Sequence, residues 1–401
     1  MSELEIEIGP GETSLAAGWR DLLQRAEPNA FMDPAALAAI HETGYAKVHV
    51  LAAWDRSRGG RTLVGLWALA EKSVGPFAYL SGPPHQLAHV SSPVIAPGMT
   101  EAVTTAFFDA IRRHPKLPKI VRLKYLDGEQ PSSAAIAAAA GSHNRVLSDK
   151  ARAYATRESG LKRSGSTRKK LRQEWNRLSA VGAVDIVNAR EPVQVQAAFE
   201  AFLIMEVKSW KGANGTALLS NSREAAFARA MIRKLAEAGH ASVALLRLDG
   251  RPIATQVLLY CGTTAYTWKI AYAAAYDRHS PGALLVDKVT EQLFAAGGME
   301  AIESCSPEGG FMETIWTGRR RTVDLLVDLT GHRSPTFFVV MLGAFVRGVA
   351  KKLRPRFNAW LAPRRSQPKP AMTPSAAPAP EPAAAMPIAV ETAAIESEKA
   401  A

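Results

Sequence analysis

Residues 268–306, WKIAYAAAYDRHSPGALLVDKVTEQLFAAGGMEAIESCS, carry the pattern that decides the fold of this chain. An aromatic and β-branched segment that ends at Ile270 is typical of a strand. Ser280-Pro281-Gly282 then predict a helix start, because serine is a frequent N-cap and proline lacks only an N–H that the first helical position does not need. The apolar spacing predicts a helix over residues 281–296. Residues 300–304 follow as a short strand.

The segments before this stretch complete one unit, and an earlier part of the chain repeats the same plan. In the second half, Asp249-Gly250 is a hairpin signal between two predicted strands, which are residues 241–248 and 253–260, with a third at 265–270 and helices before them at 192–210 and 223–238. In the first half we predict strands at 47–54, 62–70 and 77–80, a helix at 100–114 and a strand at 119–124. Each half therefore runs strand, turn, strand, strand, helix, strand, although the two sequences barely match.

The composition limits the chemistry that the chain can perform. Of its 401 residues 47% are hydrophobic, which is enough for two or three domains with full cores. Its two cysteines, Cys261 and Cys305, are too few for a disulfide framework or a multi-cysteine zinc site. We expect each of them to be a small buried hydrophobic group. The sequence has no P-loop motif and no G-x-S-x-G elbow, which removes the signals of a P-loop protein and of the common hydrolases. It has no H-E-x-x-H or C-x-x-C pair either, so we expect no bound metal.

The sequence predicts a cytoplasmic location. It contains no uncharged apolar run of 18 residues, which is the length that a membrane-spanning helix requires. Residues 1–11 are acidic and typical of a strand, which differs from the basic and apolar pattern of a signal peptide.

The formal net charge of +12 is concentrated in two basic strips. Residues 152–177 hold nine basic and two acidic residues, and residues 347–365 hold seven basic residues and no acidic one. Such strips on a near-neutral body favour an anionic partner, either a phosphate-bearing cofactor, RNA or an acidic membrane surface. The alternative is that both are solvated helix faces. In the first strip we expect a helix that Ser166 or Thr167 caps and that runs to about Ala180.

The end of the chain divides into an apolar helix and a polar tail. Residues 336–346, TFFVVMLGAFV, predict a helix that is too short to span a bilayer of about 30 Å. We expect it to pack on the second domain and to close its sheet. The alternative is that it lies in the membrane interface, with anionic headgroups bound by Arg347, Lys351, Lys352 and Arg354. Residues 362–401 are rich in Pro and Ala without a hydrophobic period, which predicts a disordered tail.

Residues 159–327 resemble the acetyltransferase domain of the BioF2-like and CelD-like group, which belongs to the GNAT superfamily and is related to the FemAB aminoacyltransferases. The matching pattern is a strand that ends in an aromatic residue, A-Y-x-x-x-Y-x-x-x-S-P-G-x-L-L, an amphipathic helix and an acidic residue on the next strand. In this chain the pattern consists of Tyr272, Tyr276, Ser280-Pro281-Gly282, Leu284-Leu285 and Glu303, with Glu206, Ser209-Trp210-Lys211 and the hairpin LLRLDGRPIATQ upstream. After that strand many relatives carry a Leu-Arg-Gly-like turn and a Tyr-Lys pair. Here Glu303-Ser304-Cys305-Ser306 stand instead, although Trp316 resembles the tryptophan that follows in relatives.

The resemblance implies an α+β fold. Because FemAB proteins carry two GNAT-like domains in tandem, we expect two such domains, each a mixed and mostly antiparallel sheet flanked by helices. The expected N-terminal GNAT-like domain covers residues 1–158, and the expected C-terminal BioF2-like acetyltransferase domain covers residues 159–361. The disordered Pro/Ala-rich tail, residues 362–401, then completes the chain.

The resemblance also implies a co-substrate, acetyl-CoA or another acyl-CoA, and residues that hold it. Ser280, Pro281 and Gly282 are expected to turn free N–H groups and the helix dipole toward the pyrophosphate. The alternative for this motif is simply a well-capped helix. By resemblance, a splayed strand offers the thioester a backbone N–H that stabilises negative charge on its carbonyl oxygen. The residues that line this position are Lys269, Ile270 and Ala271.

Direct transfer requires a base for the acceptor and an acid for the departing thiolate. Glu206 and Glu303 are the candidate carboxylate bases, because each is expected near the strand ends that hold the thioester. Tyr272 and Tyr276 are the candidate acids, and the alternative for each is a packing role. The alternatives are that Glu206 pairs with Lys208 or Lys211 and that Glu303 caps a turn.

Three functions remain open on the sequence alone. The first is an acyl-CoA-dependent N- or O-acyltransferase that acts on a small-molecule, saccharide or peptide acceptor, in a cell-envelope or exopolysaccharide context that the resemblance suggests. The second is a FemAB-like aminoacyltransferase that uses charged tRNA. The third is a non-catalytic module at an anionic membrane surface, which would make the protein peripheral to the inner membrane.

Overall fold

A computed structural model of the chain describes residues 4–10, 16–57, 60–162 and 164–361. The tail predicted at residues 362–401 lies outside this described part. The helices are α1 (Ala16–Arg25), α2 (Pro34–Thr43), α3 (Thr100–Arg113), α4 (Pro131–Ala140), α5 (Ser166–Ser179), α6 (Pro192–Lys208), α7 (Trp210–Ala213), α8 (Ser222–Glu237), α9 (Pro281–Ala295), α10 (Met312–Ile315) and α11 (Pro335–Leu361). The strands are β1 (Leu4–Gly9), β2 (Val48–Asp55), β3 (Thr62–Val74), β4 (Phe77–Gly82), β5 (Val94–Ile95), β6 (Ile120–Asp127), β7 (Asn144–Thr156), β8 (Val184–Ala189), β9 (Ala241–Leu248), β10 (Arg251–Cys261), β11 (Thr264–Tyr272), β12 (Ala301–Glu303) and β13 (Gly318–Asp328).

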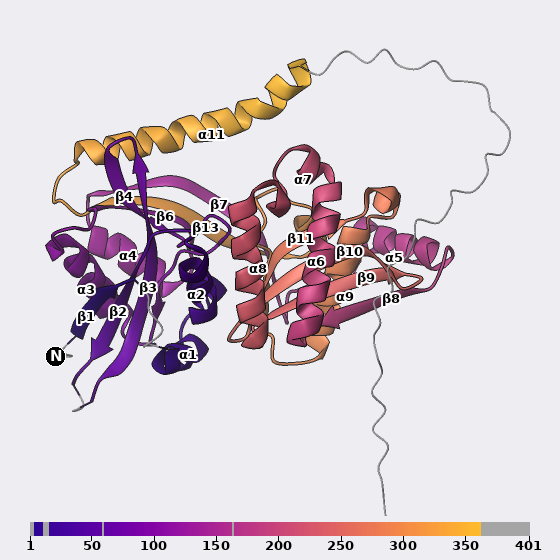
Figure 1. Cartoon of the computed structure of the whole chain (residues 1–401), viewed down its shortest axis with the longest axis horizontal. Coiled ribbons are helices and arrows are strands. Elements are labelled where there is room, and N and C mark those ends of the chain that lie inside the picture. The colour runs from indigo at the N-terminus through magenta and orange to yellow at the C-terminus, as the bar shows by residue number, and fades with distance from the viewer. Residues whose placement is uncertain (1–3, 11–15, 58–59, 163, 362–401) are drawn as a thin grey trace, which may run out of the picture. The chain divides into compact units, whose positions relative to one another are not determined.

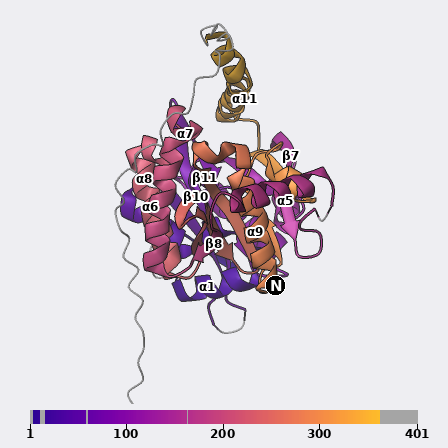
Figure 2. The same cartoon turned by 90° about the vertical axis from the view of Figure 1, so that its right-hand side faces the viewer.

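The strands of the described part form one mixed sheet. Their order is β1-β2-β3-β4-β6-β13-β7-β12-β11-β10-β9-β8, and β5 pairs with β3. The pairs are antiparallel except for β4 with β6 and β11 with β12. Each parallel pair follows a helical crossover, as such pairs require, through α3 in the first half and α9 in the second. In the second half, α6 and α8 cover one face of β10 and β11, and α9 and α5 lie on the other side (Figure 2).

The predicted repeat of architecture is confirmed, as is the α+β fold with its mixed sheet. The first half runs β2, β3, β4, α3, β6, and the second half runs β9, β10, β11, α9, β12 in the same order. The predicted helix over residues 281–296 becomes α9, with Pro281 in its first turn as expected. The helix predicted in the first basic strip becomes α5, but its capping was predicted wrongly. Gly165 occupies its N-cap at φ 95°, where a residue without Cβ is favoured.

Two long strands, β7 and β13, have no counterpart among the predicted elements. Their sequences, NRVLSDKARAYAT and GRRRTVDLLVD, carry too many charges to show a clear alternation. They pair with each other in antiparallel fashion from Tyr154 opposite Gly318 to Asn144 opposite Val327. On its other edge β13 pairs with β6, so a late strand completes the sheet of the first half, as its orange colour among the violet strands shows (Figure 1).

This pairing makes the second half an insertion between two neighbouring strands. The end of β7 and the start of β13 are adjacent, and a bridge between Leu161 and Trp316 extends their contact. Residues 157–317 therefore leave the sheet of the first half at β7 and return to it at β13. The division at residues 158 and 159 that the sequence suggested stays a prediction, and the strands on both sides of it belong to one sheet.

The two halves also share a hydrophobic core. One cluster of buried side chains extends from Trp19, Phe31 and Trp67 in the first half to Phe199 and Trp268 in the second. Polar contacts cross the same boundary, with Trp268 Nε1 donating to Leu87 O at 2.8 Å and Tyr266 Oη donating to Pro28 O at 2.7 Å. A second cluster surrounds α9 and includes the buried Trp316. Cys261 and Cys305 are both buried, as predicted, and burial raises the pKa of Cys261 to about 12.

The helix predicted from residues 336–346 is α11, and it packs on the first half rather than on the second domain. Its buried Phe337 and Val340 contact Tyr79 of β4, Ile120 of β6 and Leu326 of β13. The expectation was wrong because β13, which feeds α11, returns to the first half. Within the described residues, no helix is long and apolar enough to cross a membrane.

The insertion makes a prediction about folding. A chain of residues 1–158 alone should fail to fold, because β6 and β7 would each lose the strand between them. Joining residue 158 directly to residue 317 through a short turn, and ending at residue 349, should restore a cooperative thermal transition in circular dichroism. If residues 1–158 melt as cooperatively as the joined chain, β13 does not contribute to the stability of the first half, and the prediction is wrong.

Candidate functional site

Strand β11 changes its partners along its length, and this change defines the candidate site. The pairing of β10 with β11 shifts register between Val257 and Leu258, which leaves Trp268 of β11 as an extra residue in a bulge. On the other edge β12 pairs only with the first three residues, Thr264 to Tyr266. Beyond Tyr266, β12 supplies β11 with no backbone partner in the described part. A bulge beside an open strand edge is a common place for a binding site, because it redirects backbone donors.

The bulge places two successive side chains on the side of the sheet that α6 covers. The Trp268 ring stacks on Phe199 of α6, with centroids 6.4 Å apart. Lys269 is electrostatically coupled to Glu206 on the same helix. Ile270 returns to the opposite side, where its Cδ1 lies next to Gly282 of α9. The predicted residues Lys269, Ile270 and Ala271 thus all lie on the open part of β11.

The Lys269 ammonium is a titratable group beside the bulge. Desolvation lowers its pKa, and the negative charge of Glu206 offsets part of that effect. A lysine with a lowered pKa is a better candidate base than an ordinary one, because it gives up its proton more readily. The sequence had suggested Lys269 only for its backbone, and nothing in the pattern marked its side chain.

The structure places Glu206 beside the bulge as well, but its carboxylate already accepts hydrogen bonds from other groups. Glu206 is fully buried near the end of α6. Its Oε1 accepts a hydrogen bond from Lys211 Nζ at 3.1 Å, and its Oε2 accepts one from the Leu218 N–H at 2.8 Å. Lys211 Nζ also donates to the carbonyl of Ile270 at 2.8 Å. Glu206 therefore holds Lys211 against the open edge of β11, which is the pairing that the sequence offered as the alternative to a base.

The start of α9 differs in detail from the predicted anion-binding mouth. Ser280 occupies the N-cap position, but at φ 50° and ψ 49° it is left-handed and its side chain makes no capping hydrogen bond. The N–H groups of Ala283 and Leu284 donate to the Ser280 carbonyl at 2.9 and 3.1 Å. Because Pro281 has no N–H, the free donor of the first turn is Gly282. The side-chain cap was wrong because the preceding 3-10 helix, Ala274–His279, forces the chain into a left-handed turn.

Tyr272 lies against this helix start. A Cβ added to Gly282 would meet the Tyr272 ring at 3.3 Å, so glycine permits close packing of the strand on the helix. Desolvation and the neighbouring Asp277 raise the pKa of the Tyr272 phenol. The phenol therefore stays protonated at neutral pH, as a proton donor must.

Glu303 is buried at the end of β12, where it faces Arg152 of β7. Arg152 Nε lies 2.7 Å from Glu303 Oε1, and both side chains are at most 5% exposed. Glu303 Oε1 also accepts from the Cys305 N–H at 3.3 Å, which is the turn-capping contact that the sequence offered as an alternative. Its partner Arg152 also donates through Nη2 to the His89 carbonyl at 3.0 Å. Glu303 thus links the two halves of the sheet through its ion pair with Arg152.

Unusual backbone conformations surround this ion pair. Tyr125 at φ 58° and Cys305 at φ 51° are left-handed residues with side chains. The Arg152 guanidinium lies 5.9 Å from the Tyr125 ring centroid, and its charge also acts on Cys305. Such residues cost energy and tend to gather at functional sites, so this junction is part of the candidate site.

Two histidines of the loop after β4 complete the junction. Burial lowers the pKa of His85 to about 3, and both of its ring nitrogens lack a hydrogen-bond partner. Burial, followed by the charges of Arg152 and Lys269, holds the pKa of His89 well below its usual value. Both rings are therefore neutral at physiological pH. No motif marked His85 or His89, and Arg152 stood out only as one charge of the basic strip, because its partner Glu303 lies on a strand far along the chain.

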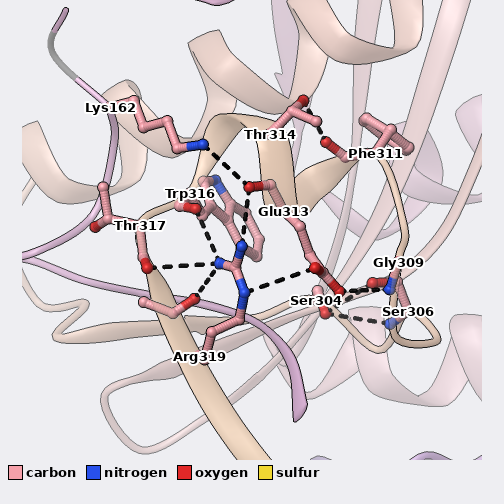
Figure 3. A network of polar contacts seen from close by, with 11 residues as sticks. Lys162, Ser304, Ser306, Gly309, Phe311, Glu313, Thr314, Trp316, Thr317 and Arg319 are labelled. Atoms are coloured by element: carbon pink, nitrogen blue, oxygen red, sulfur yellow. Dashed lines mark hydrogen bonds and ion pairs between the residues drawn. The ribbon is translucent and has the colours of Figure 1, made fainter.

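The loop between β12 and β13 is fixed by a network of polar contacts (Figure 3). Arg319 Nη2 donates to the Glu313 carbonyl at 3.0 Å, and its Nη1 donates to the Trp316 carbonyl at 3.1 Å. Lys162 Nζ reaches the same Glu313 carbonyl at 3.3 Å. At the start of this loop, Ser306 Oγ donates to Ser304 Oγ at 3.0 Å. The network fixes the path by which the chain returns to β13.

The basic strip of residues 152–177 is largely an ion-pair set in the structure. Four of its basic residues contact carboxylates, and these are Arg152 with Glu303, Arg157 with Glu300, Arg168 with Asp287 and Glu291, and Arg177 with Glu174. Three others, Lys169, Lys170 and Arg172, are exposed on α5. The strip is thus neither a single solvated face nor a continuous anion-binding surface.

Two other features carry no site. A surface hollow between α2, α6 and α8 is lined by Glu42, Glu200, Arg229 and Arg233. These charges pair with one another, Arg229 with Glu200 and Arg233 with Glu42. Among the described residues, no cluster of three or more His, Cys, Asp or Glu side chains is arranged to hold a metal ion.

Known proteins share this fold. Residues 165–306 match the family model described as an acetyltransferase (GNAT) domain. The crystal structure of FemX is 10% identical and covers 84% of this chain and all of that one, with a TM-score of 0.55. The C-terminal domain of a protein from Agrobacterium fabrum that is named as a lysylphosphatidylglycerol synthetase is 15% identical. It covers 81% of this chain and 94% of that domain, with a TM-score of 0.52. No curated protein matches the chain.

The matched domain and the bulged, open strand at its centre together define an acyltransferase of the GNAT type. Residues 165–306 are a GNAT-type acetyltransferase domain by this match, and the likeness to FemX shows that the fold is shared over both halves of the sheet.

The buried ion pair makes a stability prediction. Replacing Glu303 with Gln leaves Arg152 charged and unpaired, which typically costs about 3–5 kcal/mol. The melting temperature should fall by more than about 5 °C. Glu300→Gln, which removes an exposed partner of Arg157 on the same segment, is the matched control and should change the melting temperature little. The double variant Arg152→Met/Glu303→Leu should recover part of the loss, and no difference between Glu303→Gln and the control would contradict the assignment.

The neutral His85 makes stability depend on pH. In the unfolded chain His85 binds a proton once the pH falls below its ordinary pKa of about 6.5. In the native protein the ring stays neutral until the pH approaches its lowered pKa of about 3. Stability contributed by this group is therefore lost as the pH falls from 6.5, by up to about 1.4 kcal/mol per pH unit. Urea unfolding at pH 7.0, 6.0 and 5.0 should show a smaller decline in His85→Phe than in the wild type. An exposed control, His41→Phe, should show the same dependence of unfolding free energy on pH as the wild type. The same dependence in all three proteins would contradict the prediction.

Proposed function

We propose that this chain transfers an acyl group from acyl-CoA to an amine or hydroxyl acceptor at the open edge of β11. The observation that supports the proposal most directly is the bulge at Trp268 beside the edge that β12 leaves free. Such an edge offers backbone groups to an extended ligand arm in the way that a strand offers them to a neighbour. A strand whose two edges were both occupied would have no donors to spare.

The residues present fit an acyl-CoA in three respects. The open part of β11, from Thr267 to Tyr272, has an edge that β12 does not pair in the described part. At its end the Gly282 N–H stands free at the start of α9, where the helix dipole favours a phosphate. Lys211, held by Glu206, sets a positive charge along the same edge. When bound, acyl-CoA supplies the activated carbonyl, and this chain supplies the donors around it.

Lys269 is the proposed base. In its unprotonated form it accepts the proton of the acceptor amine or hydroxyl as the acceptor atom bonds to the carbonyl carbon. Tyr272, held protonated by desolvation and by Asp277, is the proposed donor of the proton that the departing thiolate takes when the carbon–sulfur bond breaks. Each proton is thus accounted for, with one moving to Lys269 and one leaving Tyr272.

Glu206 and Glu303 then act by position rather than as bases. Both carboxylates already neutralise a cation, Glu206 with Lys211 and Glu303 with Arg152. Their role in the proposal is to fix β11, β12 and β7 around the reacting atoms.

A FemAB-like transfer from charged tRNA is the second candidate. Its main support from the sequence was the basic strip of residues 152–177, and four of those cations are engaged with carboxylates. In the described part of that strip five cations are exposed, and two of them, Arg157 and Arg177, are paired with carboxylates. Lys169, Lys170 and Arg172 are the other three. A non-catalytic role as a membrane-surface module is the third candidate. The acceptor class, the envelope context and the cytoplasmic location, peripheral to the inner membrane, stay predictions.

Binding of the co-substrate distinguishes the first two candidates. Calorimetry on the full chain should show acetyl-CoA and CoA binding with similar affinity, since their nucleotide parts are identical, and no saturable binding of bulk tRNA at 0.15 M salt. Gly282→Glu should weaken acetyl-CoA at least tenfold by placing a carboxylate beside the pyrophosphate. Ala295→Glu, which adds the same charge at the exposed far end of α9, is the control. Tight tRNA binding without any acetyl-CoA signal would reverse the choice.

The base has its own test. Lys269→Met should lower the rate of acetyl transfer by about 10²–10⁴-fold, as loss of a general base typically does. In the wild type the rate should rise with pH as Lys269 loses its proton, and this rise should disappear in the variant. Lys269→Arg should be equally inactive, because a guanidinium keeps its charge without serving as a base. Retention of more than a tenth of the activity in both variants, with folding intact, would remove Lys269 from the mechanism.

A further inference from the structure

Residues 335–349 of α11 have two apolar faces. One of them packs on the sheet, and the other is exposed. Phe337 and Val340 are buried against β4, β6 and β13. Phe338, Leu342, Phe345, Val346 and Val349 form the other face and are exposed by 48%, 61%, 68%, 55% and 39%. Their spacing keeps them on one stripe about 100° wide. Exposed large apolar side chains that gather on one helix face mark an interaction surface.

The sheet beside this helix presents cations. The buried contacts of α11 are made by Tyr79, Ile120 and Leu326. Because side chains alternate along a strand, Arg122 and Lys124 share the face of Ile120, and Lys72 lies opposite Tyr79 in the register of β3 with β4. Within the described part, the charge of Arg347 on α11 acts on two cations of this sheet face, Lys72 and Lys124.

Within the described part, other cations act on Lys72 and Lys124 more strongly than carboxylates do. Desolvation and then the charges of Arg122 and Arg347 lower the pKa of Lys72. Asp324 of β13 is the carboxylate that acts on Lys124, and it also accepts a hydrogen bond from the Tyr125 N–H. Arg122 Nε is buried without a hydrogen-bond partner. A cluster of this kind is held ready for anionic groups that come from outside the chain.

We propose that the exposed stripe of α11 and the adjacent cationic sheet face together dock this protein on an anionic phospholipid surface. The apolar stripe enters the headgroup region, and Lys72, Arg122, Lys124 and Arg347 lie on lipid phosphates. The sequence of α11 contains no acidic residue, and beyond Val349 it adds Lys351, Lys352, Arg354 and Arg356. This combination of exposed Phe, Leu and Val with basic neighbours is the composition of helices that lie in a membrane interface.

Charge argues against the two other occupants. A second copy of the chain would set one basic surface against another, and like charges facing each other are destabilising. RNA would engage the cations but would leave the apolar stripe of Leu342 and Phe345 in water. A lipid surface alone satisfies both parts of the feature.

Vesicle co-sedimentation tests the surface with the full chain. Binding to vesicles of phosphatidylcholine with 30% phosphatidylglycerol should exceed binding to pure phosphatidylcholine at least tenfold at 0.1 M salt. Leu342→Glu/Phe345→Glu should lower the bound fraction on anionic vesicles at least tenfold. Val181→Glu/Val193→Glu changes two apolar residues that are 60% and 79% exposed elsewhere. It adds the same charge and should bind as the wild type does. Equal binding by both double variants would overturn the proposal.

A second pair of double variants tests the cationic sheet face. Lys72→Gln/Lys124→Gln should reduce binding to anionic vesicles more than Lys169→Gln/Lys170→Gln, which removes the same charge from α5. If both pairs lose binding equally, net charge rather than this face is responsible. If polyuridylate binds the wild type and Leu342→Glu/Phe345→Glu equally while vesicles bind neither, RNA is the partner. A change from dimer to monomer in that variant by light scattering, again without vesicle binding, identifies a second copy.

Insertion itself is measured with a fluorophore. A polarity-sensitive dye on Phe345→Cys should shift to shorter wavelength with anionic vesicles, and the same dye on Val193→Cys should not. Both native thiols are buried, so labelling is confined to the new cysteine. No shift at Phe345→Cys would exclude insertion. Acetyl-CoA affinity should be the same in Leu342→Glu/Phe345→Glu and in the wild type, so failure of the docking surface is separable from failure of the proposed function.

Discussion

The contact between β7 and β12, with its buried ion pair of Arg152 and Glu303, is the constraint on which the rest of the molecule depends. Without it the sheet would break into two, because β7 is the strand that pairs with β13 of the first half on one edge and with β12 of the second half on the other. Removing two charges from water is expensive, and the pair repays this only with good geometry. Arg152 Nε lies 2.7 Å from Glu303 Oε1, and Arg152 also donates to the His89 carbonyl, so the pair is joined to the loop of the first half as well. The ion pair therefore specifies one alignment of the two halves, and a hydrophobic contact would specify it less sharply.

The candidate site follows from this alignment. Since β12 must turn away to meet β7, it leaves β11 after Tyr266 and opens the edge that the proposed reaction uses. The same alignment brings the loop of Leu87 and His89 against β11, where the Trp268 indole donates to the Leu87 carbonyl. The first half thus lines the site of the second without carrying the matched acetyltransferase domain. An enzyme built in this way cannot keep its site if the insertion is cut out, because one wall belongs to the other half.

The sequence predicted those parts of the structure that local patterns control. The bulged strand β11, the helix that Pro281 starts and the repeated order of strands and helices all leave a periodic or capping signal within a few residues. The junction leaves no such signal, because Arg152 meets Glu303 and Tyr125 from strands that are distant in sequence. Charged strands such as β7 and β13 are hard to recognise, since a buried arginine with a partner looks like a solvated one in the sequence. The Ser280 cap failed for a similar reason, because the turn before it sets the backbone and a side-chain preference cannot override it.

The two proposed surfaces depend on separate charges. Arg347 of α11 acts on Lys124, and Lys124 acts on His89. Burial keeps the His89 ring neutral, so this ring passes no charge on to β11. Desolvation lowers the pKa of Lys269, and the charges that act on this amine lie on α6, α7 and α8. Docking on lipid and proton transfer at Lys269 therefore rest on different residues, which is why a variant of one surface should leave the other intact.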